Sequence, residues 1–230
     1  MRIGIIAAMP GELKPLVRGW EKMPVARGSG IQMWQRERDG DELVAVCAGM
    51  GAVAARRAFI AAEFAGSLDA VLSVGWAGAL TESAKPGDCY VVSQVIDAQT
   101  GERFEVSATG SCRLVTTVSV ADEREKHRLA ESYGAAIVDM EAAQIARLAE
   151  IRGIPVHAIK AVSDGVDARL PNLNPFIDID GKMKMASFLA YVAIRPQYWG
   201  PLAQLGANSA KGAVALAHEI ERLLVGGIKR

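Results

Sequence analysis

Hydrophobic and polar positions along the chain predict buried strands that alternate with helices. Apolar runs at 2–8, 70–75 and 155–162 are typical of strands buried on both faces of a mainly parallel sheet. Between such runs, apolar residues recur at helical spacing, as in the stripe Val138, Ala142, Ile145 and Ala149. Residues 135–167 therefore predict a strand, a helix ended near 153–155, and a second strand, which indicates an α/β fold.

The remaining pattern predicts further elements of the same kind. Residues 31–38 and 42–48 are typical of a hairpin about Asp39-Gly40, and a glycine-rich turn at 49–51 precedes an apolar helix. Residues 112–133 predict a strand followed by a charged helix. The tail after 171 predicts two helical stretches separated by Pro196 and Pro201.

Composition narrows the class of protein. At 230 residues, the chain predicts one domain covering 1–230. Half of the residues are hydrophobic, and 26 basic residues balance 26 acidic ones, which disfavours nucleic-acid binding. Three cysteines show no metal-ligand spacing, so we expect reduced thiols in a cytoplasmic protein. The N-terminal apolar run is too short for a signal core, and no run predicts a membrane span.

Acidic residues stand at two junctions of the predicted strand, helix and strand. Asp139 and Glu141 lie where the first strand gives way to the helix, and Ser163-Asp164 follows the second strand. Either acid alone is commonly a helix-dipole or turn residue. Open α/β sheets, however, bind ligands outside the carboxyl ends of their strands. We therefore expect Glu141 and Asp164 to face one crevice.

The segment VDMEAAQIA at 138–146, followed by AVSD at 161–164, resembles the nucleoside phosphorylase superfamily of purine nucleoside and uridine phosphorylases. It is most similar to the methylthioadenosine/S-adenosylhomocysteine nucleosidases. The resemblance implies a three-layer αβα fold with a central twisted mixed sheet. It also implies a purine nucleoside substrate and a homodimer or larger assembly, with no cofactor and no metal.

The same resemblance implies catalytic and substrate-binding residues. Asp164 would protonate the departing purine, Glu141 would hold the ribose, and Glu12, after Ala8 and Met9, would activate water. An oxocarbenium-like reaction needs such an acid, a negative group near the sugar and a nucleophile. We expected burial to keep Asp164 protonated. The full set of predicted substrate contacts is Met9, Met50, Gly51, Trp76, Ala77, Gly78, Asp139, Met140, Glu141, Ser163 and Phe176.

Two features bear on the reaction. Gly49-x-Gly51-x-x-Ala54 fits a loose dinucleotide fingerprint, but strands precede it and Asp69 opens the next strand, which disfavours an oxidoreductase. Phosphorylases resembling this chain bind phosphate through an arginine and a serine, where this chain has Ser73 and Trp76. The difference favours water as nucleophile. Arg56 and Arg57 could replace those donors, although a solvated helix face is their ordinary role.

Several alternatives stay open at this stage. A phosphate-dependent phosphorylase is the second hypothesis, and a non-catalytic nucleoside-binding protein is the third, because the bulk of Trp76 could abolish turnover. Phe104 could stack on the base, but a core position is the more ordinary role of a lone strand phenylalanine. Val120 and Ala121 would lie near the base by alignment to the family.

The tail is similar to that of phosphorylase-like proteins associated with hopanoid biosynthesis, which implies an adenosine that bears a lipid at its 5′ carbon. A core or dimer face is the default explanation for the apolar residues of the tail, and a lipid tunnel or membrane-surface contact is the alternative. These residues are Met183, Met185, Phe188, Leu189, Tyr191, Val192, Tyr198 and Trp199.

Overall fold

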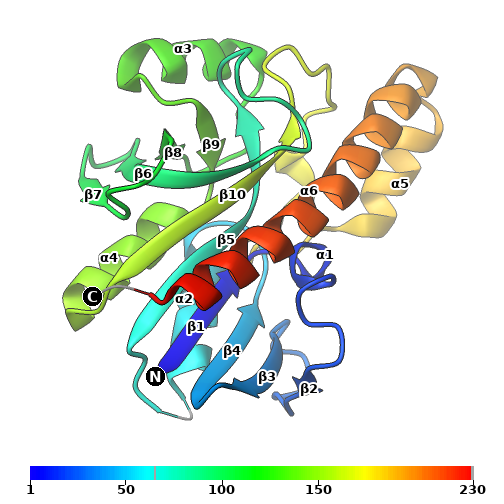
Figure 1. Ribbon diagram of the computed structural model, residues 1–230. Coiled ribbons are helices and arrows are strands. Elements are labelled where there is room, and N and C mark those ends of the chain that lie inside the picture. Colours follow the sequence, from blue (N-terminus) through cyan, green and yellow to red (C-terminus); the bar gives the residue numbers. More distant parts are fainter. Residues whose placement is uncertain (65, 229–230) are drawn as a thin grey trace.

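A computed structural model describes residues 1–64 and 66–228 of the chain. Its α/β architecture is the mixed fold expected from the sequence (Figure 1). The strands are β1 Arg2–Ala7, β2 Glu21–Lys22, β3 Gln32–Arg38, β4 Asp41–Cys47, β5 Ala70–Ala79, β6 Cys89–Asp97, β7 Arg103–Glu105, β8 Cys112–Thr116, β9 Ile137–Asp139 and β10 Val156–Asp164. The helices are α1 Pro10–Leu13, α2 Ala52–Glu63, α3 Glu123–Tyr133, α4 Ala142–Arg152, α5 Met185–Ala193 and α6 Trp199–Gly226, with 3₁₀ turns η1 Asn174–Phe176 and η2 Pro196–Tyr198.

All of these strands belong to one mixed sheet in the described part of the chain. The order is β10-β6-β8-β9-β5-β1-β4-β3-β2, with β7 beside β6, and β10 also pairs with β5. The long strands β5 and β10 run parallel, and β10 pairs antiparallel with β6 on its other side. The sheet therefore closes on itself at one end and continues as an open sheet through β1 and β4.

The sheet is covered on both faces, which confirms the three layers. Alternate residues of β1 point to opposite sides, so Ile3 and Ile5 pack with Leu216 of α6, whereas Ile6 packs with Phe59 of α2. Helices α1 and the second half of α6 cover one face, and α2 and α4 cover the other (Figure 1). The predicted residues Ala142, Ile145 and Ala149 form the buried stripe of α4, whereas Val138, placed in the same stripe from the sequence, is buried in β9.

Most elements match the sequence prediction, with one correction in the tail. The predicted hairpin turns at Asp39 and Gly40, both with positive φ, as a type I′ turn requires. Pro201 does not separate two helices, because it lies in the first turn of α6, where a missing N–H breaks no intrahelical bond. Pro196 alone marks the break after α5.

Two further predictions concern the reduced state of the cysteines and membrane-spanning helices. Cys47, Cys89 and Cys112 are free, and burial raises the pKa of the Cys47 and Cys89 thiols to about 12. In the described residues, no helix is long and apolar enough to cross a bilayer. The cytoplasmic location and the single domain stay predictions.

Candidate active site

A cavity of about 770 Å³ opens at the carboxyl ends of β1, β4, β5, β8, β9 and β10. Because these ends meet at one edge, residues far apart in sequence converge there. The predicted residues that line it are Met9, Glu12, Met50, Trp76, Ala77, Gly78, Asp139, Met140, Glu141, Ser163 and Asp164. Val120 and Ala121 also line it, as the alignment predicts.

Glu12 is a buried carboxylate held by backbone amides. The Met9 N–H donates to Oε2 at 2.7 Å, and the Trp76 N–H donates to Oε1 at 2.8 Å. Burial raises the pKa of Glu12, while these N–H donors oppose the rise. A Cβ on Gly75 would lie 2.7 Å from Oε1, so only glycine leaves room for this carboxylate. Glu12 is therefore fixed in position, largely shielded from bulk solvent, and more basic than an exposed carboxylate.

Glu141 is also held by backbone amides, one of them from the turn between β4 and α2. The Gly51 N–H donates to its Oε1 at 2.6 Å, and the Met140 N–H contacts Oε2 at 3.3 Å. Gly51 has φ 84° at the start of α2, which presents its amide to the carboxylate. Gly51 itself does not line the cavity and acts through this bond. Burial, followed by the nearby Asp139 charge, raises the pKa of Glu141 to about 7.

Asp139 and Lys160 form a buried ion pair beneath the two glutamates. The Lys160 Nζ lies 2.8 Å from Asp139 Oδ2, and both side chains are essentially unexposed. Thr116 donates to Asp139 Oδ1 at 2.7 Å, and the Ala142 N–H donates to Oδ2 at 3.0 Å. Each carboxylate oxygen therefore has protein donors, so Asp139 anchors α4 and Lys160. The Asp139 and Glu141 charges keep the pKa of Lys160 raised despite its burial.

Asp164 has a different environment from the apolar one expected. Its Oδ2 forms an ion pair with Lys126, and its Oδ1 accepts from Ser163 Oγ at 2.6 Å. Lys126 also donates to the Gly165 carbonyl at 2.7 Å, and its side chain is only 5% exposed. An ammonium donates and does not accept, so a proton donor lies directly beside the carboxylate.

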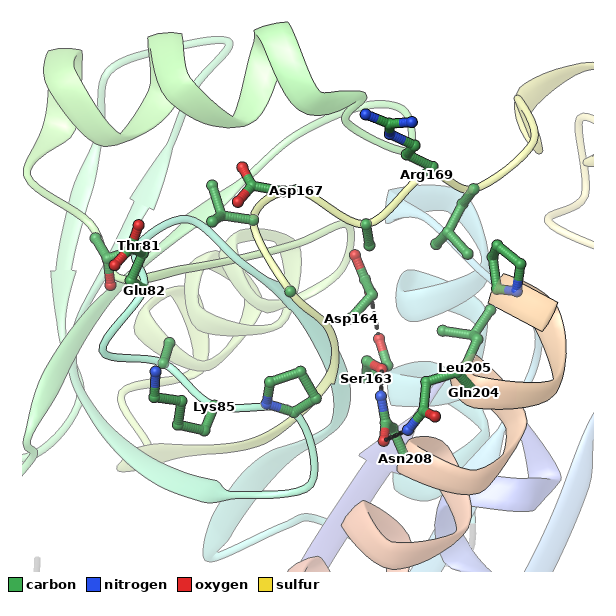
Figure 2. A pocket seen from close by; sticks show the side chains of 17 residues that line it. Thr81, Glu82, Lys85, Ser163, Asp164, Asp167, Arg169, Gln204, Leu205 and Asn208 are labelled. Carbon is green, nitrogen blue, oxygen red and sulfur yellow. Dashed lines mark hydrogen bonds between the residues drawn. The ribbon is translucent and has the colours of Figure 1, made fainter. Parts of the chain in front are cut away.

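A second cavity, of about 410 Å³, lies behind the loop that follows β10 (Figure 2). Ser163 and Asp164 line both cavities, as does Arg169. Asn208 of α6 donates to the Ser163 carbonyl at 3.2 Å, which ties this loop to the helix (Figure 2). Ser163 and Asp164 therefore form part of the wall that the two cavities share.

Trp76 is wedged between α1 and α6. Its indole N–H donates to the Ser209 carbonyl at 3.0 Å. A Cβ on Gly11 would lie 2.8 Å from the ring, and a Cβ on Gly212 would lie 3.8 Å from it. The absence of a side chain at Gly11 therefore leaves space for the tryptophan.

Phe176 lies outside the cavity wall. Its ring packs against Phe188 at 5.5 Å and Tyr191 at 5.2 Å, so it supports α5. Its neighbour Asn174 lines the cavity and exchanges two hydrogen bonds with the backbone of Val120. The segment that carries Phe176 thus closes one side of the cavity, although Phe176 itself does not reach it.

The other candidates from the sequence have structural roles. Phe104 is buried beneath the guanidinium of Arg147, which confirms its core position. Arg57 donates to the carbonyls of Ala48 and Asp180, and Arg56 is exposed on α2. Neither arginine lines the cavity. In the described residues, one group could hold a metal ion: Glu123, His127 and Asp167, all exposed, with ligand atoms within 4.8 Å of one another.

A family model for the phosphorylase superfamily matches residues 2–117 and 106–191. The chain belongs to the phosphorylase superfamily. The resemblance to this superfamily noted in the sequence is therefore confirmed. The match ends within α5, so the hopanoid-type resemblance of the tail stays a prediction.

Solved structures share the fold over their whole length. The futalosine hydrolase of Helicobacter pylori superposes with a TM-score of 0.74 at 17% identity, covering 99% of this chain and 98% of that one. A 5′-methylthioadenosine/S-adenosyl homocysteine nucleosidase of Helicobacter pylori gives 0.73 at 17% identity, covering 99% of each chain. The Arabidopsis thaliana 5′-methylthioadenosine nucleosidase gives 0.71 at 18% identity, covering 98% and 95%.

Two lysines that form ion pairs with acidic residues of the site were missed from the sequence. Lys160 sits inside an otherwise apolar strand run, and a lysine at such a position is a detectable signal for a buried ion pair. Lys126 lies in a helix with many charges and gives no such signal, because only the packing of α3 against the β10 loop brings it to Asp164.

Proposed function

We propose that this protein is a nucleosidase that hydrolyses the N-glycosidic bond of a 5′-substituted adenosine, giving adenine and the free sugar. The observation that carries the proposal is the convergence of Glu12, Glu141 and Asp164 on one cavity. The three carboxylates have separate environments, which suits three separate roles in one reaction.

The reaction needs a base for water and a group near the sugar. Glu12 takes a proton from water as the water oxygen attacks C1′ of the ribose. Its raised pKa makes it a stronger base than an exposed carboxylate. Glu141 accepts hydrogen bonds from the ribose hydroxyls while the C1′–N bond breaks. Its negative charge then stabilises the cationic sugar.

The departing purine takes the electron pair of the broken bond and needs a proton. Asp164 passes this proton to the purine nitrogen, and the neighbouring Lys126 ammonium supplies it. The ion pair and the Ser163 hydrogen bond fix the carboxylate for this step. Glu12 then releases its proton to solvent and Lys126 takes one proton up from solvent, so the net reaction consumes one nucleoside and one water.

Water is favoured over phosphate as the co-substrate by the charges around the cavity. Of its basic lining residues, Lys126 lies beside Asp164, and Arg169 lies on the loop that follows Asp164. Around Glu12 the lining is Ala8, Met9 and Trp76, and Ser73 is buried outside it. An anion as charged as phosphate needs directed donors, and these residues offer no cation.

Methionines favour an apolar 5′ substituent. Five of the eight methionines of the chain line the cavity, and a flexible thioether adapts to apolar groups of different shape. They are Met9, Met50, Met140, Met183 and Met185. A methylthio group suits such a wall, and so does a longer alkyl chain, as in the lipid-bearing adenosine that the tail suggests.

The first experiment follows adenine release by chromatography from adenosine, methylthioadenosine, S-adenosylhomocysteine and a 5′-alkylthioadenosine, each with and without phosphate. We expect phosphate-independent release from at least one 5′-substituted substrate, and kcat/KM should rank the preferred 5′ group. Release only with phosphate would establish a phosphorylase. Release from no substrate would contradict turnover and favour a binding protein.

A further inference from the structure

The tail forms a helical hairpin that extends away from the sheet (Figure 1). We call residues 185–211 the C-terminal hairpin: α5, η2 and the first half of α6. The Trp199 indole donates to the Val192 carbonyl at 3.0 Å, and the Arg195 guanidinium lies 3.8 Å above the Tyr191 ring. Tyr191 in turn stacks on Tyr198. These contacts link its two arms into one unit.

The hairpin leaves large apolar side chains uncovered. Leu189 is 58% exposed, Ile194 is 75% exposed and Trp199 is 56% exposed. The buried positions of α6 all fall in its second half, from Gly212 onward, where the helix rests on the sheet. The default explanation from the sequence is a core or dimer face, and packing in the core of this chain does not account for these three residues.

Charge in this region differs from charge in the rest of the chain. Residues 181–218 contain no aspartate or glutamate, although the whole chain has 26 acidic residues and no net charge. The same segment carries four basic residues: Lys182, Lys184, Arg195 and Lys211. A segment with exposed apolar side chains, a tryptophan among them, and with only positive charges complements an anionic bilayer surface.

We propose that the C-terminal hairpin binds the surface of an anionic lipid bilayer. Leu189, Ile194 and Trp199 enter the boundary between headgroups and acyl chains, and the basic residues contact lipid phosphates. Met185, Tyr198 and Leu205 of the same hairpin line the large cavity. Binding of the hairpin to lipid therefore places the cavity next to the bilayer. This proposal does not depend on the reaction proposed above.

A second copy of the chain fits this face less well. A two-fold contact through the hairpin would bring two basic, acid-free segments together. Their charges would repel, and no carboxylate within 181–218 could pair with them. A bilayer of anionic lipids supplies the opposite charge.

Vesicle flotation tests this proposal with the full-length protein. We expect the protein to float with phosphatidylcholine vesicles that contain phosphatidylserine, and salt should weaken this binding. The double variant Leu189→Ser/Ile194→Ser should bind at least about tenfold more weakly, because two apolar side chains no longer enter the lipid. Lys184→Glu, at an exposed position, should bind roughly fivefold more weakly.

Matched controls separate lipid binding from general surface hydrophobicity. Phe64 is 91% exposed and Ile151 is 69% exposed, and both lie outside the hairpin. Phe64→Ser/Ile151→Ser should bind vesicles like the wild type, and thermal melts should show that every variant is folded. Hydrolysis of a soluble substrate should be unchanged in the hairpin variants, because Leu189 and Ile194 do not line the cavity.

Three outcomes would overturn the proposal. One is a failure of the wild type to bind vesicles with phosphatidylserine. Another is equal binding by the hairpin and control variants. The third is a light-scattering mass that falls from dimer to monomer in Leu189→Ser/Ile194→Ser, since a second copy would then cover this face.

Discussion

The two sides of the cavity hold their carboxylates differently. Glu12 and Glu141 accept hydrogen bonds from backbone N–H groups of neighbouring turns, so their positions are set by the chain path itself. Asp164 is held by the side chains of Ser163 and Lys126. Backbone donors fix a carboxylate without offering a proton to transfer, whereas an ammonium adds a proton that can move. The difference matches a base and a sugar-binding group on one side and an acid on the other.

The largest expected effect tests the backbone-held side. Glu12→Gln should lower kcat by about 10² to 10⁴-fold, because it removes the base for water. It should also lower the free energy of unfolding by roughly 1–3 kcal/mol, since an amide nitrogen must then face the N–H of Met9 or Trp76. Steady-state kinetics and urea unfolding measure both quantities. Glu150→Gln, at an exposed site on α4, is the matched control.

Asp164→Asn should cost a similar factor in kcat, about 10² to 10⁴-fold, by removing the acid. It also leaves the buried Lys126 without its carboxylate, which destabilises the fold. Adding Lys126→Met should restore stability without restoring activity. No second side-chain substitution can restore the stability of Glu12→Gln in this way, because the hydrogen-bond partners of Glu12 are backbone N–H groups. If the second substitution also restored turnover, Asp164 would not be the acid.

The pKa of Glu141 predicts a dependence of stability on pH. This carboxyl has a folded pKa of about 7, raised above its unfolded value, so its proton stabilises the folded state at low pH. That contribution is complete below the unfolded pKa and is lost as the pH rises through about 7. Glu141→Gln does not carry this loss, so its stability relative to the wild type should rise by on the order of 3 kcal/mol between about pH 4 and mildly alkaline pH. A flat difference across this range, measured by urea unfolding, would contradict the assignment.

Lys126 gives the next test of the side-chain-held acid. Lys126→Met should lower kcat by roughly tenfold or more and change the pH profile of kcat, because the proton donor beside Asp164 is gone. Lys126→Arg keeps the positive charge and should retain more of the activity. An unchanged pH profile in Lys126→Met would limit the lysine to a structural role.

The smallest effect concerns Trp76, whose backbone N–H donates to Glu12. Gly11→Ala places a Cβ 2.8 Å from the Trp76 ring, so it should destabilise the fold by about 1–3 kcal/mol. Trp76→Phe should relieve part of this cost, and a double-mutant cycle by urea unfolding measures the coupling. Gly206→Ala is the control, because a Cβ there meets open space within α6 and should stabilise the helix slightly.

Local pattern was enough to predict much of the fold and part of the site. The stripe of α4, the turn at Asp39-Gly40 and the strand before Asp164 were visible because periodicity and turn chemistry are local. Phe176 was assigned to the site by resemblance, yet its ring supports α5. Its side-chain direction depends on packing between η1 and α5, which no local pattern encodes.

The sequence by itself determined the family, the mixed α/β class and the acids at strand ends, because motif order and apolar periodicity lie along the chain. Only the tertiary structure decided what surrounds each acid. Lys126 meets Asp164 across 38 residues, and the Gly51 amide meets Glu141 across 90. The exposure of the C-terminal hairpin was likewise decided by where α6 leaves the sheet. Charge environment and burial are sums over residues distant in sequence, so they emerge only once the chain has folded.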